Sequence, residues 1–185
     1  MKKILIGSLV GGLIIFIWQF ISNAAIDFHY KAHQYTEQQD AILNSLSQLP
    51  EGGYIMPSLP KTATQQEWEQ YMKEKEGKPW AMVQYHNSMQ YNMGMNMARG
   101  YIVNVLTVAL FCWMLLRMRP LSFGRVMTAS LFIGLIVFMN GIYTGHIWYQ
   151  FFDTSAHLSD AVASWVLAGL WLGWWLPRGN KEARG

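Results

Sequence analysis

The chain has very little of what usually identifies a soluble enzyme or a secreted scaffold. Its 185 residues include a single cysteine, Cys112, which excludes an internal disulfide framework and a C-x-x-C-H haem attachment. The sequence also lacks a G-x-x-x-x-G-K-[ST] phosphate loop, a G-x-G-x-x-G fingerprint and a G-x-S-x-G nucleophile elbow. We therefore expect neither phosphate-loop nucleotide chemistry nor a serine hydrolase of that type.

Charged residues are scarce as well, at 14% of the chain, whereas aromatic residues reach 15% and include nine Trp. Four apolar stretches approach the roughly 20 residues that a helix needs to cross a bilayer. These stretches run over Ile4–Ile21, Tyr101–Leu116, Val126–Tyr143 and Leu158–Leu176. The pattern predicts an all-α integral membrane protein with four transmembrane helices and a helical extracytoplasmic insertion between the first and the second.

The positive charges are distributed unevenly around these stretches. The segments expected in the cytoplasm contain one acid, Glu182, and the basic residues Lys2, Lys3, Arg117, Arg119, Arg125, Arg178, Lys181 and Arg184. The segments expected outside, together with Asp160 near the outer end of the fourth stretch, contain all the other acids and every histidine. This positive-inside pattern predicts a multi-pass protein of the bacterial inner membrane with cytoplasmic N- and C-termini. The basic clusters favour contact with membrane lipids, and we expect no nucleic-acid binding.

The expected parts are a first transmembrane helix, an extracytoplasmic helical insertion and a three-helix transmembrane region. Their ranges are residues 1–22, 23–99 and 100–185. The start resembles a secretory signal, but its apolar run is longer than a usual signal core, so we expect it to remain as a span. An apolar stripe from Phe28 to Leu49 predicts that the first helix continues to about Gln48. Thr64-Gln65-Gln66-Glu67 predicts a capping box at the start of another helix, and no segment predicts a strand.

Two local features bear on how the helices pack. Gly7 with Gly11, and Gly169 with Gly173, have the small-xxx-small spacing that permits close helix contact. The contact can lie within one chain or across a homodimer. The short turn from Arg117 to Arg125 predicts that the second and third spans are antiparallel neighbours.

A run rich in methionine and histidine precedes the second span. On a helix, Met82, His86, Met89, Met93 and Met97 lie within a sector of about 80°. We interpret this stripe as an adaptable packing face for a partner. Thioether and imidazole groups also suit copper, so copper is the alternative, whereas the main interpretation needs no cofactor.

A second group of histidines offers another candidate metal site. His29 and His33 lie four residues apart on the expected extension of the first helix. Such a pair can bind a transition metal, and the set considered for metal is His29, His33, His86, Met89 and Met93. The alternative for the pair is a solvated flank of the helix.

Three polar residues fall within the apolar spans. Asn104 and Asn140 are expected to form hydrogen bonds between helices. Asp160 is expected to stabilise the start of the fourth helix. Its alternative is a buried functional role with His146 or Arg99 as partner.

These observations favour a non-catalytic accessory or assembly subunit of a larger inner-membrane complex. A disulfide-free insertion of this size is only marginally stable alone, so it is expected to dock on a partner. One alternative is a copper-binding membrane protein that uses the Met/His face. Another is a membrane enzyme acting on a lipid or a quinone, with Asp160 and His146 as acid–base residues.

Overall fold

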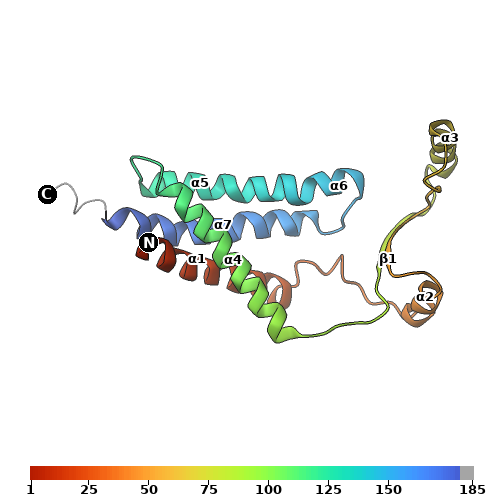
Figure 1. Cartoon of the computed structure of the whole chain (residues 1–185), viewed down its shortest axis with the longest axis horizontal. Helices are drawn as coiled ribbons and strands as arrows, with labels where there is room; N and C mark the ends of the chain where they lie inside the picture. Colours follow the sequence, from red (N-terminus) through yellow and green to blue (C-terminus); the bar gives the residue numbers. More distant parts are fainter. Residues whose placement is uncertain (180–185) are drawn as a thin grey trace. The chain divides into compact units, whose positions relative to one another are not determined.

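A computed structural model of the chain describes residues 1–179 and divides them into two units. One unit, the helical bundle, contains Met1–Gln34 and the chain from Asn92 onward, and the other, the hairpin unit, is Tyr35–Tyr91 (Figure 1). Three residues of the expected charge pattern, Lys181, Glu182 and Arg184, lie outside the described residues.

The bundle is built from helices that follow the apolar stretches. They are α1 (Lys2–Phe20) with the π-helical extension η1 (Ile21–Ala25), α4 (Met93–Leu115), α5 (Phe123–Ile136), the π-helical η2 (Val137–Tyr143), α6 (Thr144–Trp148), α7 (Thr154–Trp175) and the 3₁₀ turn η3 (Leu176–Gly179). Because η2 and α6 continue α5 without a break, one helical rod runs from Phe123 to Trp148.

Within residues 1–179, three helical segments are long and apolar enough to cross a membrane. They are Lys2–Ala25, Met93–Leu115 and Phe123–Trp148. The fourth expected span lies in α7, which has 22 residues. Its first turns carry His157 and Asp160 and its end is rich in Trp, and it is not among the three segments that are long and apolar enough to cross a membrane.

The helices pack in an order that differs from their order in the sequence. α1 lies against both α4 and α7, and α5 lies against α7, whereas α4 and α5 scarcely touch. The expectation that the second and third spans are neighbours was therefore wrong. Small residues explain the observed order: Gly12 lets α1 approach the backbone of Val105 on α4, and Gly169 makes room on α7 for Ser130 of α5.

The two glycine pairs face these internal contacts. Gly11 lies against Val108, and Gly173 lies against Phe123. Close helix contact at both pairs is confirmed, and it occurs within one chain. Because the chain's own helices cover these glycines, they are not available to form a homodimer interface. Self-association through another surface stays a prediction.

A methyl group added at Gly12 is expected to destabilise the bundle. Its Cβ would lie 2.8 Å from the backbone nitrogen of Val105, and backbone yields less readily than a side chain. We expect Gly12→Ala to lower the free energy of unfolding by about 1–3 kcal/mol, as overpacking does. The matched control is Gly124→Ala, where nothing lies within 4 Å. Thermal unfolding in detergent measures both, and equal melting temperatures would contradict the prediction.

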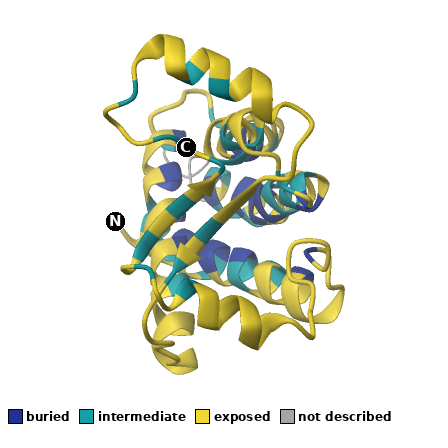
Figure 2. Cartoon of the chain, turned by 90° about the vertical axis from the view of Figure 1, so that its right-hand side faces the viewer, coloured by how far each residue is buried: buried dark blue, intermediate teal, exposed yellow. Residues whose placement is uncertain are grey.

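The hairpin unit contains α2 (Gln39–Leu46), β1 (Gly52–Met56), α3 (Gln65–Lys75) and β2 (Ala81–Tyr85). β1 and β2 are antiparallel, in a register that pairs Gly52 with Tyr85 and Met56 with Ala81. The predicted capping box of α3 is confirmed: Thr64 Oγ1 accepts from the Glu67 amide, and the Glu67 carboxylate accepts from the Thr64 amide. No residue of Tyr35–Tyr91 is buried (Figure 2).

Two predictions about the segment before the second span were wrong. The first helix ends at Ala25 and does not continue to Gln48, because Asp27 adopts a positive φ of 54° and the chain turns. Two strands form where none was expected. β1 pairs with β2 across α3, and this non-local pairing overrides the helical pattern of the sequence.

The helical Met/His stripe does not exist as predicted. Met82 lies on β2, whereas His86 and Met89 lie in the loop that follows it. Only Met93 and Met97 are on a helix, α4, which begins where the side chain of Asn92 caps the Met95 amide. The four methionines are all exposed.

Candidate metal centre

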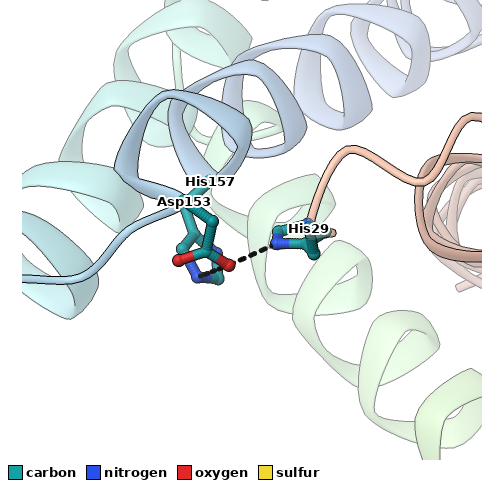
Figure 3. Close-up of side chains that lie close together, drawn as sticks. All are labelled: His29, Asp153 and His157. Atoms are coloured by element: carbon teal, nitrogen blue, oxygen red, sulfur yellow. Dashed lines mark hydrogen bonds and ion pairs between the residues drawn. The ribbon is translucent and has the colours of Figure 1, made fainter. Parts of the chain in front are cut away.

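Three potential metal ligands meet at the end of the bundle where η1 ends and α7 begins. They are His29, Asp153 and His157, and their ligand atoms all lie within 4.8 Å of one another (Figure 3). His29 Nδ1 is 2.7 Å from Asp153 Oδ2, and His157 Nε2 is 3.3 Å from the same oxygen. His29 is only 5% exposed and Asp153 only 6%. The cluster is therefore largely withdrawn from solvent.

Local backbone structure explains how these side chains come together. After η1, Asp27 adopts a positive φ, and a series of turns begins there. In these turns the Tyr30 amide donates a hydrogen bond to the Asp27 carbonyl, and the Ala32 amide donates one to the His29 carbonyl. These turns bring His29 back to the bundle. Asp153 precedes α7 and His157 lies four residues later, so both side chains project from the same face of the helix start.

A second carboxylate holds the other nitrogen of the His29 ring. His29 Nε2 is 2.9 Å from Asp160 Oδ2, and Trp18 Nε1 donates to Asp160 Oδ1 over 3.1 Å. A histidine that ligates a metal commonly donates its other N–H to a carboxylate, which fixes the ring orientation and raises the basicity of the ligand. Asp160 occupies that position for His29, and Trp18 orients Asp160.

The neighbours of His29 and Asp153 shift both pKa values. Burial works to lower the pKa of His29, but the hydrogen bonds and charges of Asp153 and Asp160 outweigh it, and the pKa is raised above its ordinary 6.5. Burial works to raise the pKa of Asp153, but the hydrogen bond to His29 and the charge of His157 outweigh it, and the pKa falls below 3.8. Both shifts favour the charged forms, an imidazolium at His29 and a carboxylate at Asp153.

The metal-free protein is expected to gain most stability from this cluster between pH 3.8 and 6.5. The contribution of His29 is complete below 6.5 and is lost as pH rises through its raised pKa. The contribution of Asp153 is complete above 3.8 and is lost as pH falls through its lowered pKa. Thermal unfolding in chelator on both sides of this window measures the effect. In the His29→Gln control, the loss of stability as pH rises above 6.5 should vanish. If that loss is unchanged in the variant, His29 is not the group that causes it.

A cavity of about 630 Å³ lies beside the cluster. Its lining residues are Ile15, Gln19, Asn23, His29, His33, Asn104, Thr107, Val137, Ile142, Asp153, His157, Asp160, Ala161, Ser164 and Trp165. Asn104 Nδ2 donates to Gln19 Oε1 over 2.9 Å, which confirms the expected interhelical hydrogen bond of Asn104. Asn140, in contrast, is exposed on η2.

The partners of Asp160 differ from those expected. Its side chain, in the second turn of α7, is 18% exposed and is bonded to His29 and Trp18. His146 accepts a hydrogen bond from the Phe151 amide and lies 2.8 Å from Thr154 Oγ1. The acid–base pair of Asp160 and His146 that the sequence allowed is therefore not assembled.

The residues that the sequence suggested as metal ligands do not lie together in the structure. His29 and His33 line one cavity, with ring centroids 6.4 Å apart, although on a turn and not on a helix. His86 and Met89 belong to the hairpin unit, where His86 lies 3.0 Å from Glu51. Met93 starts α4 and is exposed. Asp153 and His157 were not among the predicted ligands, and their only signal in the sequence is a spacing of four at the start of an apolar helix.

No known protein family, curated protein or solved structure matches the chain. The geometry must therefore identify the ligand. Two imidazole nitrogens and a carboxylate form a donor set that zinc accepts, with a fourth position left for water or another ligand. In a tetrahedral zinc site, neighbouring ligand atoms lie about 3.4 Å apart. Here the separation of His157 and Asp153 is 3.3 Å, that of His29 and Asp153 is a shorter 2.7 Å, and all three ligand atoms lie within 4.8 Å of one another. The described cavity lining contains no Met or Cys, and copper(I) prefers sulfur ligands.

Two roles fit this arrangement. In the first, the three ligands bind a metal and Asp160 supports His29. In the second, the imidazolium of His29 is a clamp that fixes the turn after η1 to the start of α7. Removal of one partner from a buried ion pair is destabilising in either case, so only metal binding separates the two roles.

Proposed function

We propose that this protein is an integral membrane protein that binds one divalent transition-metal ion, zinc above others, through His29, Asp153 and His157. The observation that supports the proposal best is the convergence of three ligand atoms from two distant parts of the chain, His29 on one side and Asp153 with His157 on the other. The carboxylate on the second nitrogen of His29 adds to it. If His29 only formed ion pairs with Asp153 and Asp160, neither His157 nor the hydrogen bond by which Trp18 orients Asp160 would be needed.

The metal centre is placed on the extracytoplasmic side of a bacterial inner membrane in this proposal. We infer that α7 is a fourth span, because it is 22 residues long and lies along both α1 and α5. The clusters of basic residues then face the cytoplasm together with both termini. A copper site on the Met/His stripe loses its main argument, because the helix that would have assembled it is absent from the described structure.

The test is metal content and metal-dependent stability of the full chain. After extraction in mild detergent, elemental analysis is expected to find about one zinc per protein, and metal-stripped protein should rebind it. At a free zinc concentration of about 100 times the dissociation constant, binding adds about 2.7 kcal/mol to the free energy of unfolding. A stripped protein whose melting temperature does not respond to zinc, nickel or copper would refute the proposal.

A second function, docking on a larger membrane complex, is supported by the hairpin unit. None of its residues is buried, and exposed apolar side chains include Ile42, Leu43, Ile55, Met56 and Met72. A unit of this kind hides too little apolar surface to offset its conformational entropy alone. We therefore propose that it is an accessory or assembly subunit whose hairpin unit folds stably against a partner protein.

Hydrogen exchange tests this second function. In the purified protein, backbone amides of Tyr35–Tyr91 are expected to exchange much faster than those of α1 and α4. In gently opened native membranes, the same amides should be protected. Equal and strong protection of both units in the purified protein would show that the hairpin unit needs no partner.

A further inference from the structure

One histidine beside the metal centre has a side chain that no polar group holds. His33 lines the same cavity as the three proposed ligands and is exposed. Among the residues that the structure describes, its side chain makes no hydrogen bond or ion pair, and its ring lies next to that of His29. Every other histidine or carboxylate of the lining takes part in the ion pairs around His29 and Asp153. His33 is therefore an uncommitted ligand beside a site that has three.

The turns that follow the positive φ of Asp27 explain why His33 lies next to His29. The Ala32 amide donates a hydrogen bond to the His29 carbonyl over 2.9 Å. The His33 amide donates one to the Tyr30 carbonyl over 3.4 Å. These two bonds hold the short segment between the histidines in a compact form. Both imidazoles consequently line one cavity, with ring centroids 6.4 Å apart.

The separation of the two rings is close to what a shared ion requires. Two imidazoles that bind one zinc at about 2.0–2.1 Å and at the tetrahedral angle have ring centroids about 5 Å apart. The rings of His29 and His157 are 4.7 Å apart. His33 is outside the group whose ligand atoms lie within 4.8 Å of one another, so its ring must move toward the ion. A shift of roughly 1 Å gives the separation from His29 that a shared zinc requires, and an exposed side chain without polar partners can make it by rotating about its own bonds.

We propose that His33 moves toward the zinc and becomes its fourth protein ligand, so that three imidazoles and one carboxylate surround the ion. The inference rests on the proposed zinc site of His29, Asp153 and His157. Zinc sites with four protein ligands are closed and contribute to folding energy, whereas catalytic zinc sites keep one position for water or substrate. The ion therefore ties residues 29–33 to the start of α7 and has no position for a substrate, which distinguishes this centre from that of a zinc hydrolase.

Zinc titration of the metal-stripped full chain in detergent, at buffered free zinc and with or without imidazole, tests the role of His33. His33→Ala should melt like the wild type without metal, because the side chain is exposed and makes no polar contact among the described residues. It should lower zinc affinity at least about tenfold, and added imidazole should restore affinity by filling the fourth position. The control is His86→Ala, an exposed histidine of the hairpin unit, which should bind zinc like the wild type. Wild-type affinity in His33→Ala, or a loss that imidazole does not restore, would overturn the inference.

Cobalt(II) in place of zinc reports the ligands of the ion through its visible absorption. The wild-type spectrum should have the strong bands of a four-coordinate ion and should not change with imidazole, because His33 fills the fourth position. In His33→Ala water takes that position, so imidazole should displace the water and shift the bands. A wild-type spectrum that shifts with imidazole would overturn the inference alone. Wild-type protein that binds neither zinc nor cobalt would overturn the proposed function as well.

Discussion

His29→Ala is expected to abolish stoichiometric zinc binding. His29 is the ligand that joins the turn after η1 to α7, and its ring is held on both nitrogens, by Asp153 and by Asp160. Its removal takes away one of three ligands together with the group that Asp160 supports. The loss of affinity should therefore exceed the roughly 10–100-fold that follows loss of an outer-shell partner. Isothermal titration of stripped protein with zinc measures it.

Companion variants keep this prediction testable if His29→Ala folds poorly. Asp153→Asn preserves the size of the side chain but weakens a carboxylate ligand, and His157→Gln removes an imidazole that is a third exposed. Both should lose most of the zinc affinity. The control is His86→Ala, which removes the exposed histidine of the hairpin unit. If His86→Ala loses zinc and His157→Gln retains it, the metal lies elsewhere.

Local signals in the sequence were sufficient for much of the fold. The apolar lengths predicted the three membrane-compatible helices, because a helix satisfies its own backbone whatever lies around it. The capping box at Thr64 was equally readable, since all its hydrogen bonds join residues three apart. Both features depend on neighbours in the chain and on nothing distant.

The missed features depend on distant partners. His29 and Asp153 are 124 positions apart, and no spacing rule connects them. The stripe from Phe28 to Leu49 has a helical period, yet Asp27 ends that helix and His29 is buried against α7. In β2, pairing with β1 outweighs the helical pattern around Met82. His29 was therefore readable from the sequence as a candidate ligand, but its contacts with Asp153 and His157 were not.

Asp160→Asn is expected to weaken zinc binding at alkaline pH and to flatten its pH dependence. Two effects of the Asp160 charge act in opposite directions. The carboxylate raises the basicity of His29 as a ligand, and its loss should lower zinc affinity about 10–100-fold. The same carboxylate helps to raise the pKa of His29, so its loss also reduces the competition between protons and zinc.

The balance between lower ligand basicity and weaker proton competition depends on pH, so the prediction can be tested by varying the pH. Above the raised pKa of His29 the proton is already gone, so only the loss of ligand basicity remains and the defect is largest. As pH falls below that pKa, weaker proton competition offsets part of the defect, and the affinities of variant and wild type converge. Zinc titrations at several pH values measure this convergence, with Trp18→Phe as the milder companion because it removes only the bond that orients Asp160. A defect that is the same at every pH would mean that Asp160 acts by holding the fold and not through the proton and metal equilibria of His29.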